Sequence, residues 1–296
     1  MPGTAVYALA LLPAVIWGFT PILSKRGLAG GGSSLQASLV VVVVTTTLYG
    51  LVVVVTVGWD TFLDLPPAAV VLFLLAGVVG AALARMANFT GIDRVGATIT
   101  TATVSIRPLF TTILAVTLLG EHVGPFTVVG IVVLVGGLVT LTLSRGGDLS
   151  GWSTRDLLFP LSAAVFFAVG NVARRYGLVT FPDVTVLEAV ALNEVGSLLA
   201  LTVYAVAAGR HDVLGAPRRT YAYFVGSGGL SAVAMLSLFA ALQAERVAIV
   251  DPLSATAPLF ATLFAAVLLR DLEQVTRGVV AGATLVTVGV ALITSV

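Results

Sequence analysis

Long apolar stretches separated by short polar turns make up most of the chain. A helix needs ~20 mostly apolar residues to cross ~30 Å of hydrocarbon, at a rise of ~1.5 Å per residue. Ten charge-poor stretches have about this length, and they cover residues 5–24, 35–57, 67–89, 96–119, 123–143, 157–177, 185–208, 220–242, 247–269 and 275–295. The pattern predicts an all-α membrane protein with ten transmembrane helices that cross a lipid bilayer.

Composition narrows the chemistry that the chain can perform. Hydrophobic residues make up 58% and charged residues 10% of the 296 residues, whereas a soluble domain carries about 25% charged residues. Cysteine is absent, and both histidines, His122 and His211, lie beside predicted loops. We therefore expect no metal site, no cofactor and no catalytic residue. A net charge of +1 gives no reason to expect nucleic acid as a partner.

An internal repeat relates the two halves of the sequence. Pro108-Leu109-Phe110 recurs 150 residues later as Pro258-Leu259-Phe260. The same offset relates Glu121 to Asp271, Phe89 to Phe239, and Gly27-Leu28 to Gly177-Leu178. Chance similarity between apolar helices explains shared valines and leucines, but hardly a Pro-Leu-Phe motif followed by an acidic residue at the same spacing. We divide the chain into repeats of five spans each, 1–146 and 147–296.

Five spans per repeat have a topological consequence. Because five is odd, the second repeat enters the membrane from the opposite side, so the two copies are inverted. Inverted repeats are a common construction of secondary transporters, in which a central site opens to either side of the membrane in turn.

Several motifs resemble the EamA-like members of the drug/metabolite transporter superfamily. The family has two five-helix repeats with a Trp-Gly type first helix, a Gly-rich third helix, and a Pro-Leu-Phe or Pro-Val-Phe motif that leads into Leu-Gly-Glu. The matching positions here are Trp17-Gly18, Gly77, Gly80, Pro108-Leu109-Phe110 and Leu119-Gly120-Glu121. The resemblance covers essentially the whole chain. It implies the fold and a transport function, but no particular substrate.

The sequence also departs from the family pattern. The sixth span has Phe167-Ala168 where the first has Trp17-Gly18. Arg85, Asn88 and Arg107 occupy positions that the family usually fills with apolar, aromatic or small residues. These departures direct attention to the third and fourth spans.

The positive charges leave the orientation of the chain open. Ten spans place both termini on one side, where the loops hold Arg174, Arg175 and Arg246. The loops on the other side hold ten basic residues: Lys25, Arg26, Arg94, Arg145, Arg155, Arg210, Arg218, Arg219, Arg270 and Arg277. The positive-inside rule then places the termini outside the cytoplasm, whereas the resemblance implies cytoplasmic termini.

Two arginines are the candidate substrate-binding residues. A charge inside a bilayer costs at least ~2.5 kcal/mol, so each one needs an explanation. Helical rise places Arg85 and Arg107 near the middle of adjacent spans, with Asn88 on the face of Arg85, and Thr100 and Thr103 on the face of Arg107. This polar stripe could bind a carboxylate or phosphate, which suits the planar guanidinium. Alternatively, internal acidic residues and carbonyls hold both arginines.

Glu194 is the candidate for charge balance or ion coupling. It lies near the middle of the seventh span, where it either neutralises one arginine or carries a transported proton. One glutamate cannot balance two arginines, so the cavity would keep a positive charge. We therefore expect an anionic or zwitterionic solute.

Other polar and aromatic residues have two interpretations each. Trp17 could stack on the substrate or pack in the core. Asn171 could line the cavity or lie at the interface beside Arg174. Asp251 before Pro252 is typical of a helix N-cap, with proline as the first helical residue.

Prolines and glycines predict local helix geometry. Pro108 and Pro258 are expected to kink the fourth and ninth spans. Gly136-Gly137 and the pair Gly278 and Gly282 suit close helix packing or a homodimer.

The sequence favours a secondary transporter that moves a small metabolite, an amino acid or organic anion, across the cell membrane by alternating access, with export as one possible direction. The alternative is a channel or another membrane protein without active transport. An intramembrane enzyme would need a nucleophile with its base, or a metal site, at membrane depth. The sequence offers no such set, so we do not expect an enzyme.

Overall fold

The computed structural model describes residues 3–144, 153–209, 215–268 and 276–295, and these residues are helical apart from short connections. The helices of the first half are α1 (Gly3–Ala29), α2 (Ser34–Thr56), α3 (Thr61–Asp64), α4 (Pro67–Gly77), the π-helix η1 (Val78–Leu83), α5 (Ala84–Val104), α6 (Arg107–Leu119) and α7 (Pro125–Leu143). Those of the second half are the 3₁₀-helix η2 (Thr154–Leu157), α8 (Leu158–Thr180), α9 (Val186–Ala207), α10 (Arg218–Ala244), α11 (Val247–Ser254), α12 (Ala257–Leu268) and α13 (Arg277–Thr294).

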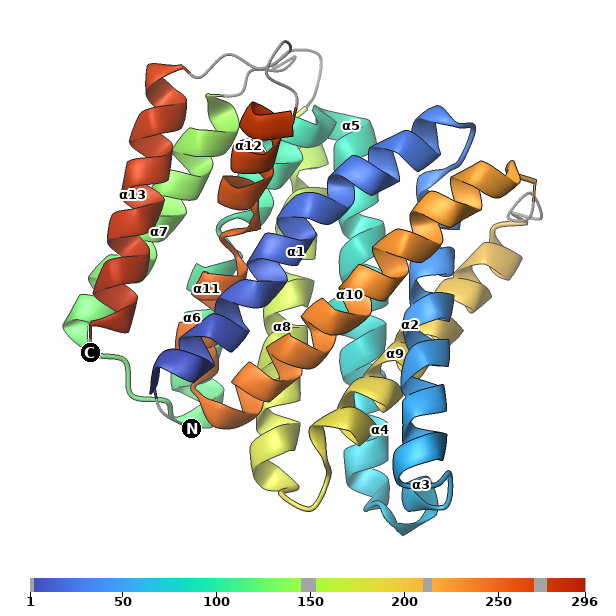
Figure 1. Cartoon of the computed structure of the whole chain (residues 1–296). Helices are drawn as coiled ribbons and strands as arrows, with labels where there is room; N and C mark the ends of the chain where they lie inside the picture. The colour runs from blue at the N-terminus through green and yellow to red at the C-terminus, as the bar shows by residue number, and fades with distance from the viewer. Residues whose placement is uncertain (1–2, 145–152, 210–214, 269–275, 296) are drawn as a thin grey trace.

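These helices form ten apolar spans long enough to cross a bilayer, which confirms the predicted number. Both termini lie on the same face of the molecule, at the bottom of Figure 1. We call this the terminal face and the opposite one the distal face. The third span runs through α4, η1 and the start of α5 to Gly96, whose φ of 81° breaks the helix before the fourth span begins.

The fourth and ninth spans are broken at equivalent positions. A turn at Ser105 and Ile106 separates α5 from α6, and a turn at Ala255 and Thr256 separates α11 from α12. Pro108 and Pro258 each follow as the second residue of the next helix. Because proline has no N–H, this early position in a helix tolerates it without losing a hydrogen bond. Both breaks place non-helical backbone at membrane depth, where it must be enclosed by protein.

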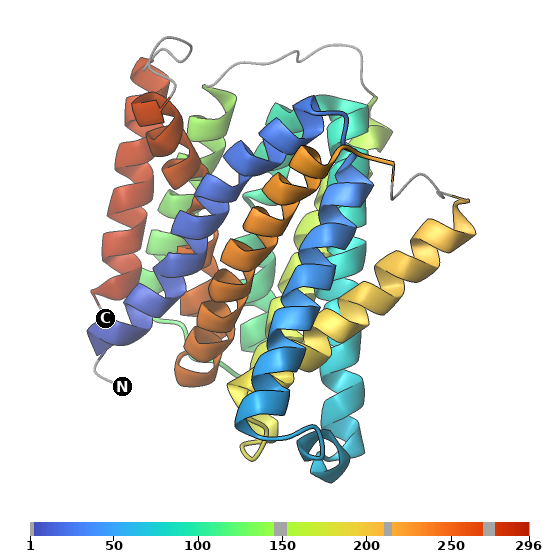
Figure 2. The ribbon, with the colours of Figure 1, turned by 45° about the vertical axis from the view of Figure 1, so that its right-hand side comes forward.

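Packing between helices follows the inverted repeat. The first span, α1, lies against α10 and α12, and its counterpart α8 lies against α5 and α6. Likewise α2 contacts α10, and α9 contacts α4. Figure 2 shows α1, α10 and α2 side by side across one side of the bundle. Corresponding helices therefore make corresponding contacts with the other half, as the predicted pair of inverted five-helix repeats requires.

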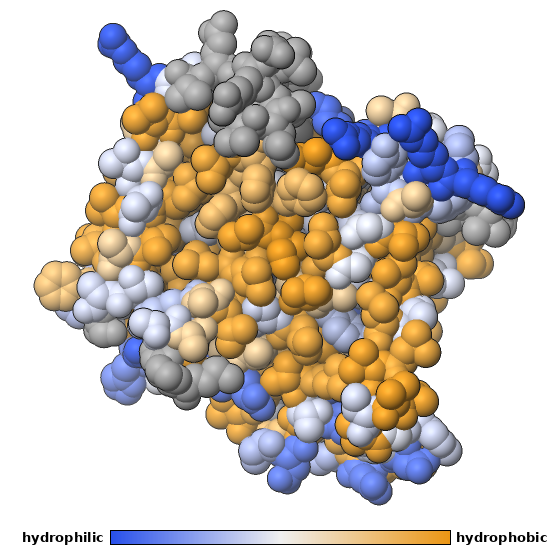
Figure 3. Space-filling model, viewed as in Figure 1, coloured by the Kyte–Doolittle hydropathy of each residue, from blue (hydrophilic) through white to orange (hydrophobic). Residues whose placement is uncertain are grey.

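The outer surface of the bundle is apolar between two polar ends. Figure 3 shows hydrophobic residues across the middle of the molecule and hydrophilic residues near both faces. Large apolar side chains such as Leu51, Val55 and Val203 are exposed. Such a surface suits lipid rather than water, and the helices satisfy their own backbone hydrogen bonds there.

Glycines allow α7 and α13 to pack closely within the chain. A Cβ atom at Gly137 would overlap the backbone of α13 at Gly282 and Val286, and one at Gly130 would meet Gly289 and Ile293. Small residues at such positions let two backbones approach each other in a membrane. Gly130 and Gly137 of α7 are thus used for packing inside the protomer, whereas a Cβ atom at Gly136 would have no neighbour within 4 Å.

Candidate functional site

A polar cavity of about 250 Å³ lies between the two repeats. Its charged lining residues are Arg85, Arg107, Arg174 and Glu194. The remaining lining residues are Trp17, Val41, Thr45, Gly80, Ala81, Phe167, Asn171, Ser231, Met235 and Leu238. The lining comes from α1, α2, η1, α5, α6, α8, α9 and α10, near the middle of their spans. Both repeats therefore contribute to a single central site.

Glycines allow the walls of this cavity to meet. A Cβ atom at Gly80 would overlap Gly170 of α8, and a Cβ atom at Gly77 would overlap the carbonyl oxygen of Asn193 on α9. The third span therefore touches α8 and α9 backbone to backbone. This contact brings Arg85 to the same space as Arg174 and Glu194.

Arg107 forms an ion pair with Asp251 from the other repeat. The distance from Arg107 Nε to Asp251 Oδ1 is 3.1 Å, and the Asp251 side chain is fully buried. The Asp251 carboxylate also accepts hydrogen bonds from Thr111 Oγ1 at 2.7 Å and from Asn171 Nδ2 at 2.5 Å. The Arg107 guanidinium also lies 5.7 Å from the ring centroid of Phe167. Protein groups thus satisfy both partners of this pair.

Arg174 connects Glu194 and Asp251 through the side chains of two asparagines. Its NH1 group donates to Asn171 Oδ1 at 2.6 Å, and its Nε donates to Asn193 Oδ1 at 3.0 Å. Asn193 Nδ2 in turn donates to Glu194 Oε1 at 3.1 Å, and Thr45 Oγ1 donates to Glu194 Oε2 at 2.6 Å. A continuous hydrogen-bonded network therefore runs from Glu194 through Arg174 to Asp251.

Arg85 differs from the other two arginines. Its NH1 atom is buried and has no hydrogen-bond partner among the residues that the structure describes. A buried donor without a partner costs free energy, and more so when it is charged. Arg85 is therefore the guanidinium that is free to bind a ligand in the cavity.

The charges around the cavity do not cancel. Three guanidinium groups, of Arg85, Arg107 and Arg174, face two carboxylates, of Glu194 and Asp251. With all five groups ionised, one positive charge is in excess. Arg107 is paired with Asp251, and the single carboxylate of Glu194 is shared between Arg85 and Arg174, so the excess charge favours an anion in the cavity.

The structure brings most of the predicted site residues to this cavity. Arg85, Arg107, Trp17, Asn171 and Glu194 all lie in its lining. Asn171 lines the cavity and does not lie at the membrane interface, because its side chain contacts Asp251 and Arg174.

Asn88 and Thr103 are not among the lining residues, and the predicted polar stripe is not formed. The prediction assumed an unbroken fourth helix, but the turn at Ser105 and Ile106 separates Thr103 from Arg107. The Thr103 hydroxyl donates to the Ile99 carbonyl of its own helix at 2.9 Å. Asn88 lies almost one turn beyond Arg85 and is half-buried outside the cavity.

Two residues of the network were misread from the sequence. Asp251 is not an N-cap, because α11 begins at Val247 and Asp251 lies inside it. Arg174 is not an interfacial loop residue, because it is 3% exposed within α8. A signal for Arg174 was present, since it follows Asn171 by three residues and so shares its helix face.

Charged contacts join the two repeats at the terminal face. The Glu121 carboxylate, at the end of α6, accepts hydrogen bonds from the backbone N–H groups of Val247 and Ala248 at 3.0 and 3.1 Å. It also lies 3.6 Å from Arg175 Nε of α8. A carboxylate at a helix N-terminus is stabilised by the free N–H groups and by the helix dipole. Glu121 thus ties the first repeat to the start of α11.

Comparison with known proteins agrees with this architecture. The sequence matches the model of a family described as the EamA-like transporter family, over residues 4–143 and 155–295. One solved crystal structure is similar with a TM-score of 0.77, at 17% sequence identity, and the match covers 98% of this chain and 96% of that one. At 17% sequence identity, this similarity shows a shared fold and nothing more. No curated protein matches the sequence.

Proposed function

Because the chain belongs to the EamA-like transporter family, as its motifs predicted, we propose that it is a secondary transporter for a small anionic or zwitterionic metabolite. The solute binds in the central cavity, and the protein exposes it to each side of the cell membrane in turn. Amino acids and small organic acids are the solute classes with the required chemistry, and export is one direction that this mechanism allows.

The observation that carries this proposal is the free guanidinium of Arg85. Its NH1 atom is buried without a hydrogen-bond partner in the described part of the chain, and it lines a cavity with one positive charge in excess. A carboxylate of the solute would accept the missing hydrogen bond and neutralise the charge. Hydrogen bonds between a guanidinium and a carboxylate are among the stronger ones in proteins.

The size of the cavity limits the solute. Pockets for drug-sized molecules measure about 300–1,000 Å³, and this cavity measures about 250 Å³. Trp17 and Phe167 in the lining offer flat apolar surfaces for the remainder of a small molecule. A solute of about amino-acid size therefore suits the site better than a large drug.

Inverted repeats and the ties at the terminal face support alternating access. Glu121 links α6 to the start of α11 and to Arg175, and breaking these ties would open the cavity toward that face. Two similar halves can exchange conformations so that either face opens in turn.

Reconstitution of the purified protein tests the proposal. A thermal-shift screen against amino acids and small organic acids should identify a stabilising solute, and proteoliposomes should show saturable counterflow of it. Arg85→Gln should abolish binding and counterflow, whereas Arg155→Gln, at an exposed arginine of the distal face, should leave both intact. Ohmic conductance without counterflow would indicate a channel instead. Normal counterflow by the Arg85 variant would rule out this site.

A further inference from the structure

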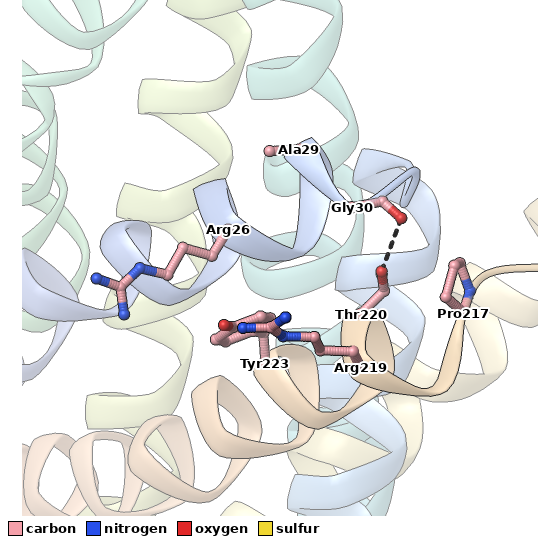
Figure 4. Close-up of a pocket in the computed structure, with 7 residues that line it drawn as sticks. All are labelled: Arg26, Ala29, Gly30, Pro217, Arg219, Thr220 and Tyr223. Atoms are coloured by element: carbon pink, nitrogen blue, oxygen red, sulfur yellow. Dashed lines mark hydrogen bonds between the residues drawn. The ribbon is translucent and has the colours of Figure 1, made fainter.

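A second concave site lies at the distal face, between the end of α1 and the start of α10. It measures about 480 Å³ and shares no lining residue with the central cavity. Figure 4 shows Arg26 of α1 and Gly30, the residue after α1, beside Arg219, Thr220 and Tyr223 of α10. We call this site the α1–α10 groove.

Close packing of α1 on α10 fixes the geometry of the groove. The Thr220 hydroxyl donates to the Gly30 carbonyl oxygen at 3.0 Å. A Cβ atom at Gly27 would overlap the ring of Phe224, and a Cβ atom at Gly30 would overlap the Thr220 hydroxyl. The two helix ends are therefore held in direct contact, and the side chains on either side of the contact have defined positions.

The groove carries positive charge for which the described residues provide no counter-charge. Arg26 and Arg219 are exposed, and neither has a hydrogen bond or an ion pair with any residue that the structure describes. Lys25 and Arg218, next to them in the chain, are also exposed. Like charges gathered without a counter-charge repel one another, so this arrangement favours an anionic ligand.

Helix ends of opposite polarity meet at the groove, because α1 ends there at Ala29 and α10 begins there after Pro217, and only the end of α10 attracts an anion. Helix α10 is 27 residues long, and its N-cap is Pro217, which makes no side-chain hydrogen bond to the first turn. The first N–H groups of a helix have no partner inside the helix, and the dipole makes this end positive. The N-terminus of α10 thus faces the same groove as the two guanidinium groups.

The position of the groove indicates where the anion comes from. Arg26 is near the distal end of the first span and Arg219 at the distal end of the eighth, so the groove lies at the level of lipid headgroups. Tyr223 lies about one turn inside the eighth span, at the depth where tyrosines are enriched in membrane proteins. Gly226 lies one turn further along the same face of α10, and its nearest neighbour is the half-buried Leu23 of α1, so apolar surface for an acyl chain adjoins the groove. A phospholipid matches both features, because its phosphate suits the positively charged groove and its acyl chains suit the apolar surface beside it.

We propose that the α1–α10 groove binds the phosphate group of an anionic phospholipid. Arg26 and Arg219 contact the phosphate oxygens, the Tyr223 hydroxyl donates to the headgroup, and the N–H groups at the start of α10 face the charge. The bound lipid holds together the distal ends of α1 and α10, the helices that supply Trp17 and Ser231 to the central cavity.

Lipid titration of the full-length protein in detergent tests this proposal. Native mass spectrometry and thermal-shift measurements should detect binding of phosphatidylglycerol but not of phosphatidylcholine. Each basic residue near an anionic lipid contributes about fivefold to affinity, so the double variant Arg26→Gln/Arg219→Gln should bind phosphatidylglycerol about 30-fold more weakly. The matched variant Arg155→Gln/Arg277→Gln removes two exposed charges from the same face outside the groove and should bind like the wild type.

Three results would overturn the proposal. Equal binding of phosphatidylglycerol and phosphatidylcholine by the wild type would remove the role of charge. Equal loss of binding in both double variants would show a general effect of the distal face. Competition by millimolar inorganic phosphate with full effect would show a site for free phosphate rather than for lipid. The wild-type comparisons stand even if the groove variant fails to fold.

Discussion

Arg107 and Asp251 form a buried ion pair across the two repeats, 144 residues apart in the chain. Each belongs to one of the broken spans, Arg107 just after the first break and Asp251 just before the second. The pair therefore joins the two places where non-helical backbone lies inside the membrane. We expect the stability of the protein to depend on this pair.

Asp251→Asn should destabilise the protein by about 3–5 kcal/mol, because it leaves the Arg107 charge buried without its partner. The apparent melting temperature in detergent measures this loss. Asn keeps the shape of the side chain, so the effect reports the charge rather than a cavity.

The double variant Arg107→Gln/Asp251→Asn serves as the control for that prediction. Removing both charges leaves no unpaired ion, so the double variant should be more stable than Asp251→Asn alone. If the two variants melt at the same temperature, the ion pair does not determine the stability of this region.

Glu194→Gln should strengthen the binding of an anionic solute. It keeps an oxygen that can accept the hydrogen bond from Thr45 but removes one of two negative charges around the cavity. A unit charge a few ångströms away changes a binding free energy by more than about 1.4 kcal/mol at an effective dielectric constant of ~20, so we expect at least about a tenfold tighter Kd.

Calorimetry of Glu194→Gln with the solute found in the thermal-shift screen measures this change. Transport by the variant at several pH values separates the two roles of Glu194. A role in charge balance leaves the pH dependence as in the wild type. Loss of that pH dependence would instead identify Glu194 as the proton carrier and contradict the charge-balance role.

Gly170→Ala should disrupt the contact between α8 and the third span, because the new methyl group would overlap the backbone of Gly80. Overpacking of this kind costs about 1–3 kcal/mol, and more where backbone must move. Gly136→Ala is the matched control, since a Cβ atom there has no neighbour within 4 Å. Equal melting temperatures for the two variants would show that α8 and the third span can move apart at this contact without a loss of stability.

Glu121→Gln should loosen the start of α11. It removes the charge that faces Arg175 and one of the two oxygens that cap Val247 and Ala248. Loss of a cap costs about 1 kcal/mol, so hydrogen exchange of the first amides of α11 should accelerate about fivefold. Asp64→Asn is the control, because this exposed carboxylate of α3 lies at the same face away from α11. Unchanged exchange in Glu121→Gln would contradict the capping role.

The architecture could be predicted from the sequence because membrane spans follow directly from length and hydrophobicity. The repeated motif at Pro108 and Pro258 also indicated, from the sequence alone, that the two halves are inverted copies of each other. The depth of Arg85, Arg107 and Glu194 followed from counting residues along their spans. These inferences depend on position along a single helix, which the sequence specifies.

The partners within the site could not be predicted in the same way. Asp251 was misread because an Asp-Pro pair has a local explanation, and the local pattern contains no information about Arg107 on another helix. Arg174 was misread because it lies beside Arg175 near a span end, although its side chain turns inward. Thr103 was misplaced because a break in the helix changes which residues share a face.

The two repeats match in backbone but not in charge. At the repeat offset, Asp251 corresponds to Thr101, Arg107 to Ala257 and Arg85 to Met235. Under the alternating-access mechanism that we propose, these ionic groups have no duplicate in the other repeat, so the inward-facing and outward-facing forms differ chemically and are expected to differ in energy. An unloaded carrier therefore rests preferentially facing one compartment, and a solute must supply enough binding energy to move it toward the other.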